Sequence, residues 1–181
     1  MFNIHKNDTL PLNVEIGPGI YPLDGFVKLD CAAGEGRYNF LWGVDRMPFD
    51  DNTVDLIYAS HVLEHVAWYQ TVDALKEAHR VLKPGKSIEV WVPDFQYIVL
   101  CYRDGKCGDE WRRHNADGYY MNWVNGRVFA YGSQENWHRA LFDRNSLRGC
   151  LFDAGFKEVR WLDKPRGYDH GPINLGMEGI K

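Results

Sequence analysis

The distribution of apolar and polar positions along the chain predicts short buried strands that alternate with turns and helices. Apolar and β-branched runs bounded by Gly, Pro, Asp and Asn are typical of strands. Such runs predict strands at residues 13–16, 26–30, 54–60, 87–92, 157–162 and 174–179, with a further short one near 38–42. Apolar positions at helical spacing predict helices at 70–82 and 143–155. This order indicates an α/β fold with a mostly parallel sheet.

Two parts of this pattern allow more specific predictions: the first predicted helix, and the link between the first two predicted strands. The apolar face of the helix is expected to consist of Val72, Leu75, Ala78, His79 and Leu82. Pro84-Gly85 is expected to end it, because proline cannot continue a helix. The link between the first two strands contains Pro22 and Asp24-Gly25 and is too short for a full helix.

A glycine turn follows the first predicted strand. Gly17 and Gly19 can adopt backbone angles forbidden to other residues, and without side chains they let a ligand approach the main chain. Asp30 closes the second predicted strand. A glycine turn after one strand and an acid after the next are how α/β sheets hold a nucleoside, with the acid on the ribose hydroxyls. The third glycine of a dinucleotide fingerprint is missing, which argues against a nicotinamide-dependent enzyme.

Composition and charge argue against several classes of protein. We expect one domain over residues 1–181, and a net charge of −4 argues against a general nucleic-acid binder. No run approaches the ~20 apolar residues of a membrane span. The four cysteines form no Cys-x-x-Cys pair, which favours a reduced, cytoplasmic protein. Cys and His are not clustered along the chain, so no metal site is expected.

Five blocks stand in a recognisable order: Val14–Gly19, Asp30, Met47–Asp55, Ser60–His65 and Arg80–Gly85. Together they resemble the class I S-adenosylmethionine-dependent methyltransferases, in the methyltransferase-domain group with a Leu-Glu-His block. The resemblance covers about residues 13–160. It implies a Rossmann-like, seven-stranded, mostly parallel sheet with the last strand antiparallel, and S-adenosyl-L-methionine as cofactor.

The resemblance also implies roles for the turn and the acid. The backbone of Glu15, Gly17 and Gly19 would cradle the methionine part of the cofactor. Asp30 would hold the ribose hydroxyls, because one carboxylate can accept two hydrogen bonds from a cis-diol. The short link before Asp30 departs from the usual pattern, since a helix N-terminus normally helps to hold the methionine carboxylate.

Three more residues complete the implied cofactor site. Asp45, with its neighbour Arg46, would lie at the adenine edge. Ser60 and His61, just past the fourth strand, would lie near the sulfonium. His65 is expected to pack or to cap a helix rather than to act in catalysis.

Residues 95–139 follow the fifth strand and are expected to form a small aromatic-rich cap that binds the methyl acceptor. Its aromatic residues include Trp111, Tyr119, Tyr120, Trp123, Phe129, Tyr131 and Trp137. Its arginines are Arg103, Arg112, Arg113, Arg127 and Arg139. Aromatic faces and guanidinium groups suit a sugar ring or a carboxylated small molecule. A cap that only buries its own apolar core is the alternative.

The expected function is therefore a small-molecule methyltransferase. Transfer to oxygen of a saccharide or related metabolite is what the related group's place in glycan pathways implies. His138 is the candidate general base, because it follows the cap and would enter the site from the acceptor side. The alternative is an S-adenosylmethionine-binding protein without transferase activity, in a regulatory or structural role. No membrane or nucleic-acid partner is expected.

Overall fold

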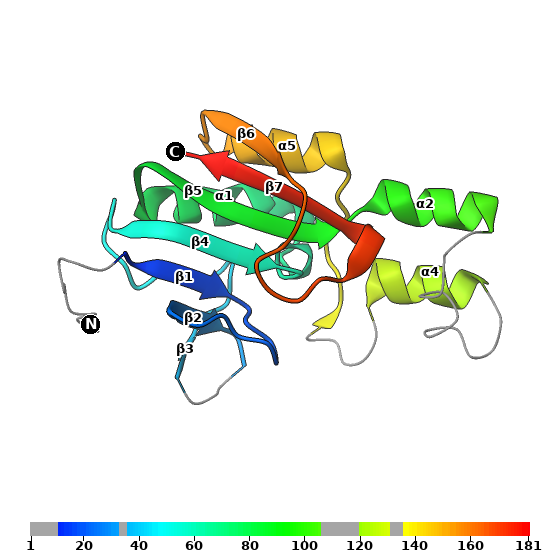
Figure 1. Cartoon of the computed structure of the whole chain (residues 1–181), viewed down its shortest axis with the longest axis horizontal. Helices are drawn as coiled ribbons and strands as arrows, with labels where there is room; N and C mark the ends of the chain where they lie inside the picture. Colours follow the sequence, from blue (N-terminus) through cyan, green and yellow to red (C-terminus); the bar gives the residue numbers. More distant parts are fainter. Residues whose placement is uncertain (1–10, 33–35, 106–119, 131–135) are drawn as a thin grey trace.

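A seven-stranded sheet with the order β3-β2-β1-β4-β5-β7-β6 forms the centre of the molecule (Figure 1). The computed structural model describes residues 11–32, 36–105, 120–130 and 136–181. The strands are β1 (Asn13–Ile16), β2 (Phe26–Asp30), β3 (Arg37–Asn39), β4 (Val54–Ser60), β5 (Leu82–Pro93), β6 (Glu158–Leu162) and β7 (Asn174–Ile180). The first five strands are parallel, and β7 is antiparallel to β5 and β6. The predicted fold class is confirmed.

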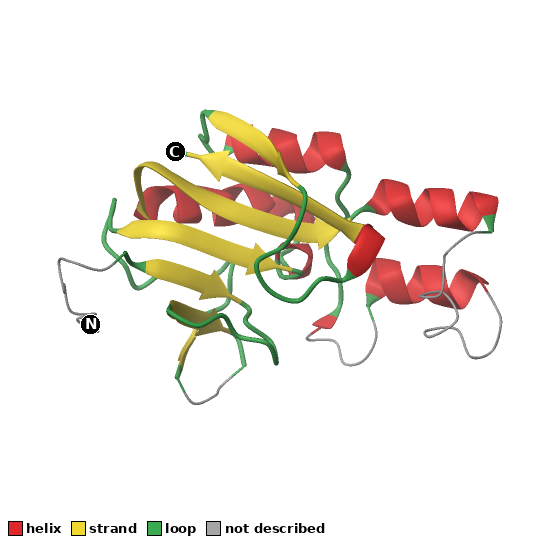
Figure 2. Cartoon of the chain, viewed as in Figure 1, coloured by secondary structure: helices red, strands yellow, loops and turns green. Residues whose placement is uncertain are grey.

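Helices cover one face of this sheet and extend beyond one end of it. The helices are α1 (Thr71–Val81), α2 (Phe95–Asp104), α4 (Tyr120–Phe129), α5 (Arg144–Asp153) and the short 3₁₀ helices η1 (Leu63–His65), η2 (Trp68–Gln70) and η4 (Gly171–Ile173). Figure 2 shows α1 and α5 behind the sheet, and α2 and α4 beyond the carboxyl end of β5. No helix in the described part of the chain is long and apolar enough to cross a membrane.

The main core lies between the sheet and the pair α1 and α5. Ile57 of β4 and Val90 of β5 are fully buried there, as are Leu75 of α1 and Leu147 of α5. Each such side chain contributes about 1.5–3 kcal/mol by leaving water. A separate small cluster joins α2, α4 and η4 and consists of Ile98, Cys101, Trp123 and Ile173. The described part of residues 95–139 therefore has an apolar core of its own.

The helix α1 forms where expected, but its buried face is rotated from the predicted one. The buried residues are Thr71, Ala74, Leu75, Ala78 and Val81, whereas Val72 and His79 are only half-buried. The helix ends at Val81, one residue before the predicted end, but Pro84-Gly85 is not what ends it. The chain turns extended at Leu82 and enters β5, so Pro84-Gly85 lies inside an irregular stretch where the pairing with β4 shifts register. Small alanines on the inner face let the helix backbone approach the sheet closely.

The segment between β6 and β7 crosses the opposite face of the sheet and is attached to it by polar contacts (Figure 1). The guanidinium of Arg166 donates two hydrogen bonds, of 2.6 and 2.7 Å, to the carboxylate of Glu89. The Gly167 N–H donates to the Tyr58 hydroxyl at 3.2 Å. These contacts fix the chain that leads to His170 and Asn174 at the site edge.

Candidate functional site

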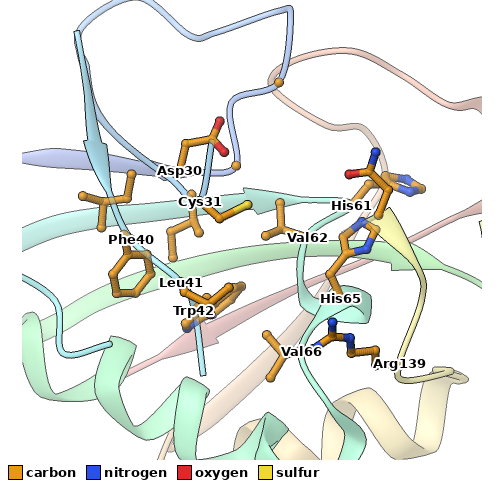
Figure 3. A pocket seen from close by; sticks show the side chains of 15 residues that line it. Asp30, Cys31, Phe40, Leu41, Trp42, His61, Val62, His65, Val66 and Arg139 are labelled. Carbon is orange, nitrogen blue, oxygen red and sulfur yellow. The ribbon is translucent and has the colours of Figure 1, made fainter. Parts of the chain in front are cut away.

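The carboxyl ends of β1, β2 and β4 meet at one edge of the sheet, where the strand order reverses between β1 and β4. Ligands of open α/β sheets bind outside such a switch point. A cavity of about 200 Å³ lies here (Figure 3). It is lined by Ile16, Gly17, Gly19, Leu29, Asp30, Cys31, Phe40, Leu41, Trp42, His61, Val62, His65, Val66, Asn136 and Arg139. The fold thus brings four of the seven predicted cofactor residues into one cavity.

The glycine turn has the backbone geometry that its sequence predicts. Gly17 and Gly19 have φ of +63° and +54°, in the left-handed region that favours glycine. A Cβ at Gly17 would lie 2.3 Å from Cγ2 of Val62, so no larger residue fits. A Cβ at Gly19 would meet nothing within 4 Å. Gly19 thus leaves bare main chain at the cavity wall, where a ligand can approach it.

Glu15 is buried beside this turn, but its side chain is not part of the cavity lining. Its Oε2 accepts a hydrogen bond of 2.8 Å from the Leu23 N–H. Burial raises the pKa of Glu15, although the Leu23 contact and the nearby Lys28 and Arg37 oppose the shift. The carboxylate therefore organises the helix-free link between β1 and β2.

Asp30 lies at the end of β2 with 8% of its surface exposed, and it lines the cavity. Its Oδ1 accepts from the Ala32 N–H at 3.0 Å, and its Oδ2 accepts from Arg37 Nη1 at 2.6 Å. The same guanidinium donates to the Gly19 carbonyl. Arg37, which sequence reasoning missed, thus connects the acid to the glycine turn. A carboxylate has about four lone-pair sites, so these two contacts leave capacity for a diol.

Asp45 does not line the cavity. It is exposed, and its Oδ2 accepts from the Leu41 N–H at 2.7 Å, which closes the turn after β3. The cavity wall here consists instead of Phe40, Leu41 and Trp42. The indole of Trp42 is held by a 3.0 Å hydrogen bond from Nε1 to the Ala74 carbonyl. The apolar run directly after β3 was the signal in the sequence for this wall.

Ser60 is the last residue of β4 and His61 follows it, but only His61 lines the cavity. His61 has a φ of +54°, which is uncommon for a residue with a side chain. Its Nε2 contacts Asn174 Oδ1 at 2.8 Å, and its Nδ1 lies 3.4 Å from Glu64 Oε1. Burial would lower the pKa of His61, but its contacts with the Glu64 carboxylate and with Asn174 together raise it.

The predicted base, His138, is brought to this site by backbone hydrogen bonds. The Arg139 and Ala140 N–H groups donate to the Glu64 carbonyl at 2.7 and 3.1 Å, which attaches residues 136–142 to the loop after β4. His138 Nε2 lies 3.9 Å from Glu64 Oε1, and burial lowers the pKa of His138. Glu64, which sequence reasoning left without a role, lies between His61 and His138.

A second cavity of about 350 Å³ adjoins the first. It is lined by Trp68, Val128, Phe129, His138, Arg139, Ala140 and Leu141. Arg139 lines both cavities, and Figure 3 shows it with His61 and His65 on the side of the first cavity opposite Asp30 and Phe40. The arrangement is a cavity at the switch point of the sheet beside a second, mostly apolar cavity that carries one histidine and one arginine.

Comparisons with known proteins bear on this site. The family model described as "Methyltransferase domain" matches residues 29–89. An "Uncharacterized 37.1 kDa protein in transposon TN4556" of Streptomyces fradiae is 33% identical over 90 residues, which cover 50% of this chain and 26% of that protein. A demethylmenaquinone methyltransferase of Staphylococcus epidermidis is 30% identical over 124 residues, covering 62% of this chain and 44% of that enzyme. The chain thus spans less than half the length of these curated relatives.

Solved structures show the same fold. An S-adenosylmethionine-dependent methyltransferase of Archaeoglobus fulgidus has a TM-score of 0.60 at 13% identity and covers 96% of this chain and 87% of its own. A possible histamine N-methyltransferase of Thermotoga maritima has a TM-score of 0.54 at 20% identity, with coverage of 96% and 84%. The fold that the resemblance implied is confirmed: the chain has the fold of S-adenosylmethionine-dependent methyltransferases.

Proposed function

We propose that this protein transfers a methyl group from S-adenosylmethionine to a small molecule. The observation that carries the proposal is the meeting of Gly17, Gly19 and Asp30 in one cavity at the switch point of the sheet. These are the residues that the resemblance assigns to the cofactor. Bound there, S-adenosylmethionine would supply an electrophilic methyl group on its sulfonium.

Each side of the cavity would hold one part of the cofactor. The bare main chain of Gly17 and Gly19 would receive the methionine part, with Glu15 fixing the turn behind it. Asp30 would accept hydrogen bonds from the ribose hydroxyls. The apolar wall of Phe40 to Trp42 suits the adenine ring better than exposed Asp45, because an apolar cavity favours a flat aromatic ring.

His61 and Ser60 would lie toward the methyl end. His61 lines the cavity on the side away from Asp30, next to His65 and Arg139, and Ser60 precedes it at the end of β4. This polarity aims the methyl group toward the second cavity. An acceptor atom must come within about 3–3.5 Å of the methyl carbon for an in-line displacement.

The second cavity is the proposed acceptor site, and residues 95–139 contribute part of its wall. Arg139 would bind an anionic group of the acceptor, while Trp68 and Phe129 would pack against a ring. A saccharide or related metabolite methylated on oxygen fits this chemistry. The Staphylococcus relative's name points to quinone-type acceptors as a second class, and the mostly apolar lining of this cavity favours them equally. His138 is the proposed proton acceptor if the acceptor is a hydroxyl.

A thermal-shift experiment tests the cofactor assignment first. S-adenosylmethionine, S-adenosylhomocysteine and NAD are added in parallel. A ligand that binds only the native state raises Tm, because it stabilises that state by about 2.7 kcal/mol at a hundredfold excess over Kd. A shift with NAD alone would refute the proposal. Transfer of labelled methyl to a panel of saccharides, phenols and hydroquinones tests the activity. Cofactor binding without transfer to any of these supports the alternative, a non-catalytic binding protein.

A further inference from the structure

Four of the chain's seven histidines gather around one buried glutamate at the boundary of the two cavities. Glu64 is 1% exposed and lies on η1, which directly follows the cavity-lining residues His61 and Val62. Among the residues that the structure describes, neither of its carboxylate oxygens receives a hydrogen bond of ordinary geometry. Two histidine nitrogens lie close to its Oε1, Nδ1 of His61 at 3.4 Å and Nε2 of His138 at 3.9 Å. A buried carboxylate with so little compensation requires a positive charge nearby.

Hydrogen bonds fix the tautomers of the two histidines on either side. His138 Nδ1 contacts the Arg127 carbonyl at 3.1 Å, and His65 Nδ1 contacts the Trp137 carbonyl at 3.3 Å. A carbonyl oxygen only accepts, so both Nδ1 atoms donate the hydrogen in these contacts. In the neutral form of its ring, His138 then keeps a lone pair on Nε2, which lies 3.9 Å from Glu64 Oε1. Two such electron-rich atoms can share one cation.

Histidines that bind metals show this arrangement. They donate their other ring N–H to a backbone carbonyl or a carboxylate, which orients the ring and makes the free nitrogen a better ligand. Glu64, His65 and His138 each offer one ligand atom, and these three atoms lie within 4.8 Å of one another. Ligands about 2.0–2.1 Å from one ion are at most roughly 4.2 Å apart. The 3.9 Å separation of Glu64 Oε1 and His138 Nε2 already satisfies that limit.

We propose that Glu64, His65 and His138 bind a divalent transition-metal ion of the zinc type. Two imidazoles and one carboxylate form a donor set that suits zinc and its neighbours more than magnesium or calcium, which prefer oxygen ligands. The sequence predicted no metal site, because Cys and His are not clustered along the chain and His138 is remote from Glu64 and His65. The fold brings His138 to Glu64 across 74 positions, through the backbone bonds to the Glu64 carbonyl.

His61 supports the site without belonging to the three ligands. The Asn174 amide donates from Nδ2 to Asp169 at 2.7 Å, so its Oδ1 accepts from His61 Nε2 at 2.8 Å. His61 Nδ1 then faces Glu64, and as an imidazolium His61 compensates the carboxylate when no ion is bound. His170 packs against His61 with ring centres 3.9 Å apart and ring planes tilted by 37°. Burial and the neighbouring His61 lower the pKa of His170 to about 4.

The position of the ion would connect it to the acceptor, and this step rests on the proposed function. His65 lines the first cavity, His138 lines the second, and Arg139 lines both. An ion held by three protein ligands keeps open positions, as catalytic zinc sites do. Such an ion favours an acceptor with a hydroxyl or phenolic oxygen, whose pKa it would lower. His138 would then act as a ligand in place of the general base.

Metal binding to the full chain tests the inference directly. The protein is stripped with a chelator and dialysed, then titrated with Zn²⁺ by calorimetry and with Co²⁺ by visible absorption, with Mg²⁺ and Ca²⁺ as comparison ions. We expect one Zn²⁺ per chain and a Co²⁺ spectrum typical of low coordination number. Glu64→Gln and His138→Gln are each expected to weaken binding at least tenfold. His79→Gln is the matched control, because His79 lies on α1 and packs against Phe156 instead.

Two results would overturn the site. Wild-type protein that binds Zn²⁺ no better than Mg²⁺ contradicts it, and so does equal Zn²⁺ affinity in wild type, Glu64→Gln and His138→Gln. Melting curves without metal show whether each variant is folded, and if Glu64→Gln does not fold, His138→Gln alone decides. S-adenosylmethionine binding measured with and without chelator separates the two proposals. If the protein binds the cofactor in chelator but has no Zn²⁺ site, only the metal site is refuted. If it binds Zn²⁺ but not the cofactor, only the proposed function is refuted.

Discussion

Replacing Gly17 by alanine tests whether the glycine turn is shaped for close approach. The variant places a side chain at a φ of +63° and a Cβ 2.3 Å from Cγ2 of Val62. Valine is branched at Cβ and cannot rotate its methyl groups away cheaply. Either Val62 or the turn must move, and both line the cavity.

The magnitude follows from two separate costs. A non-glycine residue in the left-handed region costs about 1–2 kcal/mol. Overpacking against a fixed neighbour costs typically about 1–3 kcal/mol. Gly17→Ala should therefore lower the free energy of unfolding by about 2–5 kcal/mol. Gly25→Ala isolates the first cost, because Gly25 has a φ of +77° and open space at its Cβ position. Its expected loss is about 1–2 kcal/mol.

Urea unfolding of the variants, with calorimetric titration of S-adenosylmethionine, measures both effects. Gly25→Ala is expected to bind the cofactor as wild type does. Gly19→Ala should lose as little stability as Gly25→Ala yet lose cofactor affinity, because its methyl group would enter the cavity. Adding Val62→Ala to Gly17→Ala should recover the packing cost but not the backbone cost. Equal stability of Gly17→Ala and Gly25→Ala would refute the close contact, and unchanged affinity in Gly19→Ala would remove that residue from the cofactor site.

Three further predictions concern single carboxylates. Asp30→Asn should weaken S-adenosylmethionine binding by about 10–150-fold, since a hydrogen bond to a charged group contributes about 1.5–3 kcal/mol; unchanged calorimetric affinity would contradict the ribose assignment. Burial raises the pKa of Glu15 in the folded state, so the charged carboxylate destabilises the fold at neutral pH. Glu15→Gln should therefore be more stable than wild type at pH 7 and equally stable below the ordinary glutamate pKa of 4.5. Urea titrations at pH 7 and pH 4 measure the two stabilities, and a difference that does not change with pH would count against this reasoning. Asp143→Ala should cost about 1 kcal/mol at neutral pH by removing the N-cap of α5. The Ser146 N–H lowers the pKa of Asp143 below its usual 3.8, so this stabilisation is present above 3.8 and is lost as pH falls further; a cost that persists in strong acid would argue against the cap.

The sheet and the cavity at its switch point could be predicted from the sequence because their signals are local. Buried strands are short apolar runs, and Gly17, Gly19 and Asp30 sit at fixed offsets from them. Such local signals could not predict the start of β5. Pro84-Gly85 indicates a helix end in isolation, but pairing with β4 extends the strand around it.

The polar cluster around Glu64 depends on tertiary structure. His138 is remote from Glu64 in the sequence, and only the backbone bonds from Arg139 and Ala140 bring it there. Asp45 illustrates the converse: its position after a probable strand suggested the adenine edge, but its carboxylate is used by its own turn. Neither contact has a periodicity from which it could be predicted.

The two outermost strands of the sheet have a consequence for behaviour in concentrated solution. Exposed strand edges can recruit other chains into aggregates, and short or charged edges resist this. β3 has three residues, and the five-residue β6 carries an ion pair in which Arg160 Nε lies 2.7 Å from Glu158 Oε1. Neither border offers a long apolar template, so destabilised variants should remain in solution long enough for their unfolding to be measured.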